Sequence, residues 1–198
     1  MSNASRDLSK NIYSSTFSSF CQEVSRFRLS HMIHDTEVGV EKLGRNQEPK
    51  ALSDWMVVVF AHCNLFRITL KIHYSDADAR AFANFCRGET NSELSITAIN
   101  DFMREYGNQL IGAVKQCVED QAGYAKVSCP LVTRSQDAPF FAPNPASAAF
   151  EDHWKLKTAN QQIQCSLILE FLDRNFMKEI FLPAFFDFDS VGDVEFFE

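Results

Sequence analysis

The stretch Thr97-Ala-Ile-Asn-Asp101-Phe-Met-Arg-Glu105-Tyr-Gly-Asn108-Gln-Leu-Ile-Gly112-Ala-Val-Lys115-Gln-Cys-Val-Glu-Asp120 decides how the rest of the chain is interpreted. At 100° per residue, one side of a helix built from it collects the apolar residues Ile99, Phe102, Met103, Tyr106, Leu110, Ala113 and Cys117. Asp101, Glu105, Asn108 and Gly112 gather on nearly the opposite side. The spacing therefore predicts a helix that buries one face and displays an acidic and amide-bearing face to another molecule.

The segments around this helix alternate between helical and strand-like patterns. Apolar spacing, turn residues and β-branched runs predict helices over 11–34, 77–87 and 173–181, and strands over 36–42, 55–60, 65–72, 126–133, 153–157 and 161–172. Asp76 is the expected N-cap of the 77–87 helix, and residues 135–149 are expected to form a loop. This order predicts an α+β fold, an antiparallel β-sheet with two long helices on one face, plus N-terminal and C-terminal helical segments.

Length and composition limit the possible classes of protein. A chain of 198 residues with 45% hydrophobic composition fits a single domain, with a core at about 12–172 and a Phe-rich acidic extension at 173–198. A net charge of −7 argues against nucleic acid or an anionic membrane as the main partner. No long apolar run occurs, and the six cysteines are scattered singly, so a cytoplasmic protein with reduced, mostly buried cysteines and no metal site is expected.

Three parts of the sequence together resemble one known family. Asp101-Phe-Met-Arg-Glu105-Tyr-Gly-Asn108-Gln-Leu-Ile-Gly112 resembles the D-x-x-x-E-x-x-N-x-x-x-G helix of the CheC/CheX/FliY chemotaxis phosphatases. Ser128-Cys129-Pro130-Leu131-Val132 is similar to the Ser-Pro-Pro strand of that family, and Thr36-Glu37-Val38 is similar to its N-terminal strand. The chain has one E-x-x-N string, as CheX does, whereas CheC and FliY typically have two. The resemblance is therefore closest to CheX, and it covers about residues 12–172.

The resemblance implies hydrolysis of the aspartyl phosphate of a CheY-type response regulator in two-component or chemotaxis-like signalling. Asn108 would position the attacking water, and Glu105 would pair with the active-site Lys of the regulator. Asp101 and Gly112 would support them, Asp101 by favouring the helix N-terminus and Gly112 by leaving room for the partner's backbone. The regulator would carry the Mg²⁺, so no cofactor is expected on this chain. A homodimer joined through its sheets is also implied.

Two other functions stay open at this stage. The first is a non-catalytic CheX-like scaffold that binds a response regulator or another signalling protein. The acidic tail with Phe185, Phe186, Phe188, Phe196 and Phe197 could then be a partner-binding segment, or its aromatic rings could cap the domain's own core. The second is an enzyme built on cysteine or histidine. The predicted burial of Cys117 argues against it, because the reactive species is an accessible thiolate.

Overall fold

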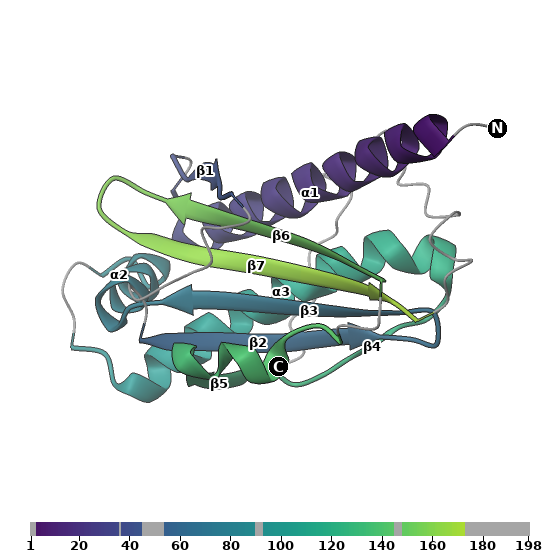
Figure 1. The fold of residues 1–198 in the computed structure, drawn as a ribbon. Helices are drawn as coiled ribbons and strands as arrows, with labels where there is room; N and C mark the ends of the chain where they lie inside the picture. Colours follow the sequence, from purple (N-terminus) through teal and green to yellow (C-terminus); the bar gives the residue numbers. More distant parts are fainter. Residues whose placement is uncertain (1–2, 36, 45–53, 90–92, 145–147, 173–198) are drawn as a thin grey trace.

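The computed structural model describes residues 3–35, 37–44, 54–89, 93–144 and 148–172. Its elements in chain order are α1 (Asn3–Ile33), β1 (Gly39–Lys42), β2 (Trp55–His62), β3 (Phe66–Tyr74), α2 (Asp76–Cys86), α3 (Ile96–Ala122), β4 (Lys126–Val127), β5 (Leu131–Arg134), η1 (Ser135–Phe141), β6 (Ala148–Lys157) and β7 (Gln162–Phe171) (Figure 1). The strands form one antiparallel sheet in the order β1-β6-β7-β3-β2-β4, and β5 also pairs with β2.

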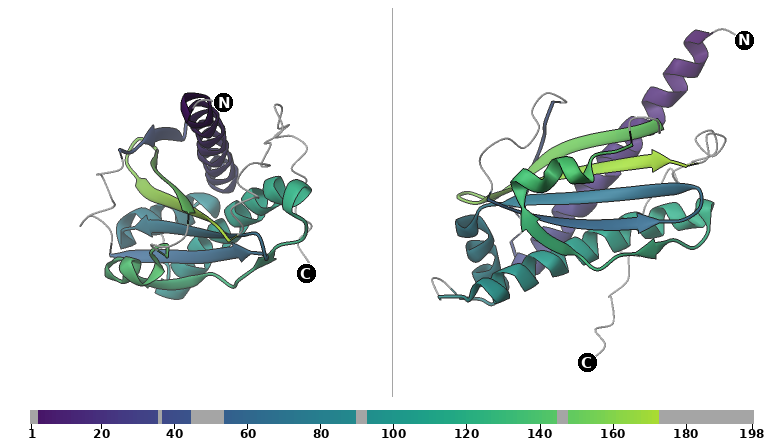
Figure 2. Two further views of the ribbon diagram at one scale, coloured as in Figure 1. Left: turned by 45° about the vertical axis from the view of Figure 1, so that its right-hand side comes forward. Right: turned by 60° about the horizontal axis from the view of Figure 1, so that its bottom comes forward.

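The three α-helices lie on one face of this sheet (Figures 1 and 2). Alternate residues of the strands point towards the helices and are buried, as Ile68 and Leu70 of β3 and Leu167 of β7 illustrate. They join the buried residues of α1, α2 and α3 in one hydrophobic cluster. The predicted α+β fold, with an antiparallel sheet and helices on one side, is confirmed. No helix in the described ranges is long and apolar enough to span a membrane.

The helices differ from the prediction in length and in one cap. The long helices are α1 and α3, with 31 and 27 residues, whereas α2 has only 11 residues and ends before Gly88, whose φ is +68°. Ser75, not Asp76, is the N-cap of α2, because Ser75 has extended backbone angles and its side chain accepts a hydrogen bond from the backbone N–H of Asp78. The helix predicted at 173–181 lies outside the described residues.

Both predicted hairpins are present. The β2–β3 register runs from Trp55 opposite Tyr74 to His62 opposite Arg67. In the second hairpin, β6 begins five residues earlier than predicted, inside the segment expected to be a loop. The early start of β6 was not predicted because Asp152 places a charged residue where the strand pattern requires a buried one. Asp152 is a buried carboxylate on the helix side of β6, and it accepts hydrogen bonds from two polar residues of α1, Ser18 and Gln22.

The strand predicted at 126–133 is an edge strand with a break. Ser128 lies between β4 and β5, where its backbone N–H donates to the carbonyl of Phe60 at 2.9 Å. Its hydroxyl accepts from the backbone N–H of Phe60 at 3.0 Å. The Ser128 side chain therefore takes the place of a strand carbonyl just before Pro130, which has no N–H to donate.

The 3-10 helix η1 lies over the sheet face away from α1 (Figure 2), and a buried polar layer lies beneath it. Lys71 and His73 of β3 are almost fully buried there. The Lys71 ammonium donates to the carbonyl of Ala138 at 3.3 Å, and His73 Nδ1 lies 3.1 Å from the hydroxyl of Ser135. That hydroxyl donates its proton to the carbonyl of Trp55, so it accepts from His73, which fixes the Nδ1–H tautomer of the ring.

We expect the protein to lose stability in mild acid because of His73. Burial, with smaller effects of Lys71 and His153, lowers the pKa of His73 from 6.5 to about 4. Between these pH values the unfolded chain binds a proton that the folded chain excludes, so the free energy of unfolding falls as the pH falls, by up to about 3 kcal/mol.

Urea unfolding at several pH values between 7 and 4 measures this loss. His73→Gln should flatten the pH dependence, and the same exchange at the exposed His31 controls for the substitution itself. Equal slopes for wild type and His73→Gln would contradict the assignment.

Candidate functional site

Helix α3 is fixed at both ends by local hydrogen bonds. The Ser95 side chain accepts from the backbone N–H of Ala98 at 3.2 Å, which makes Ser95 the N-cap. Gly123 is the C-cap, with a φ of +73°, and its N–H donates to the carbonyl of Glu119. The helix thus runs from Ile96 to Ala122 and slightly exceeds the predicted 97–120 at each end.

The apolar face of α3 is buried as predicted, and it is wider than predicted. The expected members are buried, and so are Gly107, Ile111, Val114 and Val118. Gly107 sits directly against the sheet, since a Cβ built on it would lie 3.1 Å from Cγ1 of Val57. The missing side chain therefore allows α3 to approach β2 closely. Apolar periodicity could not show this, because glycine contributes almost nothing to it.

The opposite face of α3 presents the four predicted residues in one line. Asp101 and Asn108 are exposed, and Glu105 and Gly112 are partly exposed. Their spacing of four, three and four residues keeps them on the same side of the helix. An added Cβ on Gly112 would meet no heavy atom within 4 Å, so the surface beside it is open. The structure thus brings all four side-chain positions to one accessible surface, which we call the α3 stripe.

The side chains of Glu105 and Asn108 differ in their hydrogen bonds to neighbouring residues. Gln109, one turn on, donates from Nε2 to Oε1 of Glu105 at 3.0 Å. This contact orients the carboxylate and leaves Oε2 for another partner. Among the described residues, the Asn108 side chain has no hydrogen-bond partner, so its amide can donate to and accept from a molecule placed over α3. Sequence reasoning missed the role of Gln109, although its spacing of four from Glu105 is a usable signal.

Asp101 does not act at the helix N-terminus as expected. Because α3 begins at Ile96, Asp101 lies beyond its first turn, where the effect of the helix dipole has decayed. Its carboxylate instead pairs with Arg104 at 3.1 Å on the exposed surface. The stripe therefore carries the guanidinium of Arg104 beside the carboxylates, which was not predicted.

The cysteines offer no comparable reactive arrangement. All six are free; Cys21, Cys117 and Cys165 are buried, whereas Cys129 is exposed, so fewer are buried than expected. Burial raises the pKa of Cys21 and brings that of Cys165 to about 12, which disfavours the nucleophilic thiolate. In the described part of the chain, no group of three or more His, Cys, Asp or Glu side chains is arranged to hold a metal ion.

No protein-family model matches the sequence, and no curated protein matches it either. Solved structures do match. The chemotaxis protein CheX from Vibrio vulnificus superimposes with a TM-score of 0.60 at 12% identity, over 78% of this chain and 99% of that one. A CheC-like superfamily protein from Shewanella sp. PV-4 gives 0.57 at 15% identity, over 78% and 97%. A chain of the CheX–CheY–BeF3–Mg²⁺ complex from Borrelia burgdorferi gives 0.57 at 13%, over 77% and 96%.

These matches cover nearly the whole length of the compared chains and more than three quarters of this one. The arrangement predicted from the E-x-x-N helix and the two hairpins is the one found. The chain therefore has the fold shared by CheX and the CheC-like proteins.

Proposed function

We propose that this protein is a phosphatase that hydrolyses the aspartyl phosphate of a CheY-type response regulator. The observation that carries the proposal is the α3 stripe, with an oriented carboxylate and an unengaged amide one turn apart on the exposed face of a helix. The CheX-like fold supports it, and so does the Borrelia burgdorferi complex, in which CheX was crystallised with CheY, BeF3 and Mg²⁺.

The chemistry of an acyl phosphate makes modest demands on such an enzyme. The phosphoryl group is already reactive, and the regulator supplies the Mg²⁺, so the phosphatase has to place one water in line with the phosphorus. The amide of Asn108 can hydrogen-bond that water without bringing negative charge against the phosphoryl oxygens. Asn108 is therefore the residue that we assign to catalysis, and no metal or nucleophile of this chain is needed.

Glu105 is the residue that we assign to docking. Its carboxylate, oriented by Gln109, would pair with the active-site Lys of the regulator and align α3 over the phosphate. We expect Glu105→Ala to weaken binding to a BeF3-activated, Mg²⁺-loaded regulator by roughly tenfold or more, because a charge-assisted contact is lost. Stability should change little, since the residue is partly exposed. Binding is measured by calorimetric titration.

The matched control is Glu37→Ala, which removes an exposed carboxylate that precedes β1. This variant should bind the regulator as the wild type does. If Glu105→Ala unfolds the protein, or binds with wild-type affinity, the docking role is wrong.

A non-catalytic scaffold is the competing function on the same surface. It would use the α3 stripe for binding alone and would regulate the partner by occupancy. The decay of a phosphorylated regulator separates the two, since only the phosphatase accelerates decay when it is far scarcer than the regulator. The single domain, the homodimer and the cytoplasmic location stay predictions that accompany the proposed function.

A further inference from the structure

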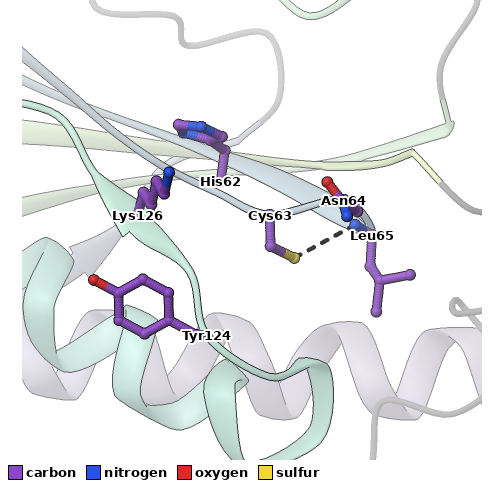
Figure 3. Close-up of a pocket in the computed structure, with 6 residues that line it drawn as sticks. All are labelled: His62, Cys63, Asn64, Leu65, Tyr124 and Lys126. Carbon is purple, nitrogen blue, oxygen red and sulfur yellow. Dashed lines mark hydrogen bonds between the residues drawn. The ribbon is translucent and has the colours of Figure 1, made fainter.

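A second surface feature lies at the other end of α3, between the chain that follows this helix and the β2–β3 turn. It is a hollow of about 490 Å³ lined by His62, Cys63, Asn64, Leu65, Tyr124 and Lys126. Figure 3 shows the side chains of Cys63 and Leu65 pointing to the same side of the turn as the Tyr124 ring. We call this feature the turn pocket. It is separate from the α3 stripe and does not depend on the phosphatase proposal.

The turn pocket presents the ammonium of Lys126 on a chain whose net charge is −7. His62 and Lys126 are opposite each other in the β2–β4 register, and both are exposed. Within the described part of the chain, Lys126 has no ion-pair partner. None of the described residues that line the pocket is a carboxylate. The nearby Glu119 is occupied, because it pairs with Lys115 at 3.3 Å and accepts from the backbone N–H of Ala125 at 2.7 Å.

The pocket also offers an aromatic and apolar surface. Tyr124 is 76% exposed, which is unusual for so large a ring, and the ammonium of Lys115 lies 5.0 Å from the centroid of the ring. Leu65 adds a partly exposed aliphatic wall beside it. A ligand that combines aromatic rings with carboxylates would satisfy both parts of this surface.

The chain's own C-terminal segment has this combination and starts beside the pocket. The backbone N–H of Leu172 donates to the carbonyl of Leu65 at 2.8 Å, so the chain leaves β7 next to a pocket wall. Residues 183–198 contain five Asp or Glu and five Phe, with no Lys or Arg. The 13 residues from Leu172 to Phe185 can span up to about 40 Å, so length does not prevent a return to the pocket.

We propose that the turn pocket binds the acidic, Phe-rich tail of its own chain, through the string Phe185-Phe186-Asp187-Phe188-Asp189. A Phe ring would stack on Tyr124 against Leu65, and a carboxylate would pair with Lys126. Because the tail is tethered, its effective concentration is on the order of millimolar, and individually weak contacts suffice to hold it.

Zero-length carbodiimide cross-linking of the full chain tests the proposal directly. An equal mixture of unlabelled and ¹⁵N-labelled protein is treated at low concentration, and the cross-linked peptides are identified by mass spectrometry. We expect Lys126 to be joined to Asp187 or Asp189 within one isotopic form. Joining across the two forms would show that a second copy supplies the tail and would overturn the proposal, as would the absence of any Lys126-to-tail product.

Alkylation of Cys63 supplies an independent readout, with the exposed Cys129 as the control inside the same molecule. Loss of the tail contact in Lys126→Gln or in Asp187→Asn/Asp189→Asn should speed alkylation of Cys63 several-fold and leave Cys129 unchanged. Acceleration confined to Cys63 reports uncovering, because Cys129 in the same molecule controls for a general change in thiol reactivity. An unchanged Cys63 rate in both variants would also overturn the proposal.

Discussion

Asn108→Ala is expected to reduce the phosphatase activity roughly 100-fold, because one positioned hydrogen-bonding group at the reacting centre is typically worth this much. The loss should be in kcat rather than in KM, since the amide acts on the water and not on docking. Stability should not fall, because Asn108 is exposed and alanine is the better helix former. Initial rates over a range of phosphorylated-regulator concentrations, together with urea unfolding, measure both.

The matched control is Asn160→Ala, the same exchange at an exposed position in the β6–β7 turn. It should leave kcat and KM as they are in the wild type. An Asn108→Ala variant that is as active as this control would remove Asn108 from the mechanism, and an unfolded one would mean that α3 presents the other face.

Gly107→Leu is expected to have the largest effect on stability. A Cβ at this position already approaches Val57 to 3.1 Å and Ile72 to 3.7 Å, so a branched side chain has no room between α3 and the sheet. Overpacking of this kind costs about 2–3 kcal/mol and would lower the melting temperature by roughly 5–10 °C. Because Gly107 lies between Glu105 and Asn108, the displaced helix should also lose phosphatase activity. Calorimetry and the phosphatase assay on the folded fraction test this.

Gly112→Leu is the control for this prediction, since an added Cβ there meets nothing within 4 Å. Removing a glycine from the helix should keep or raise the free energy of unfolding, by up to about 1 kcal/mol. If the two leucine variants are equally stable, the tight approach at Gly107 does not constrain α3.

The parts of the fold that could be predicted are those in which apolar periodicity and backbone preferences agree. Helix α3 and the β2–β3 hairpin are of this kind, because the faces with which they pack against each other are almost purely apolar. The start of β6 and the cap of α2 escaped prediction because they depend on polar contacts between distant or neighbouring residues. From the sequence alone, Asp152 is expected to face solvent, and only the hydrogen bonds from Ser18 and Gln22 of α1 explain its burial. Ser75 and Asp76 are equally good N-cap residues by type, so the sequence could not decide between them.

The position of the candidate site could be predicted from the sequence, but not all of the contacts within it. Periodicity placed Asp101, Glu105, Asn108 and Gly112 on one face, and their exposure in the structure agrees. Periodicity could not show that Gln109 orients Glu105, because the two side chains could equally have been solvated without contacting each other. The turn pocket was also out of reach, because it joins residues that are about 60 positions apart and depends on the β2–β4 pairing.

The most direct test of the phosphatase assignment is a multiple-turnover measurement. CheY-type regulators are phosphorylated in the presence of Mg²⁺, and the loss of phosphate is followed with one molecule of this protein per roughly 50 of regulator. We predict that at least one regulator loses its phosphate much faster than it does alone, over many turnovers per molecule of protein. Unchanged decay of every regulator that the protein binds would contradict the assignment and leave binding alone as the function of the α3 stripe.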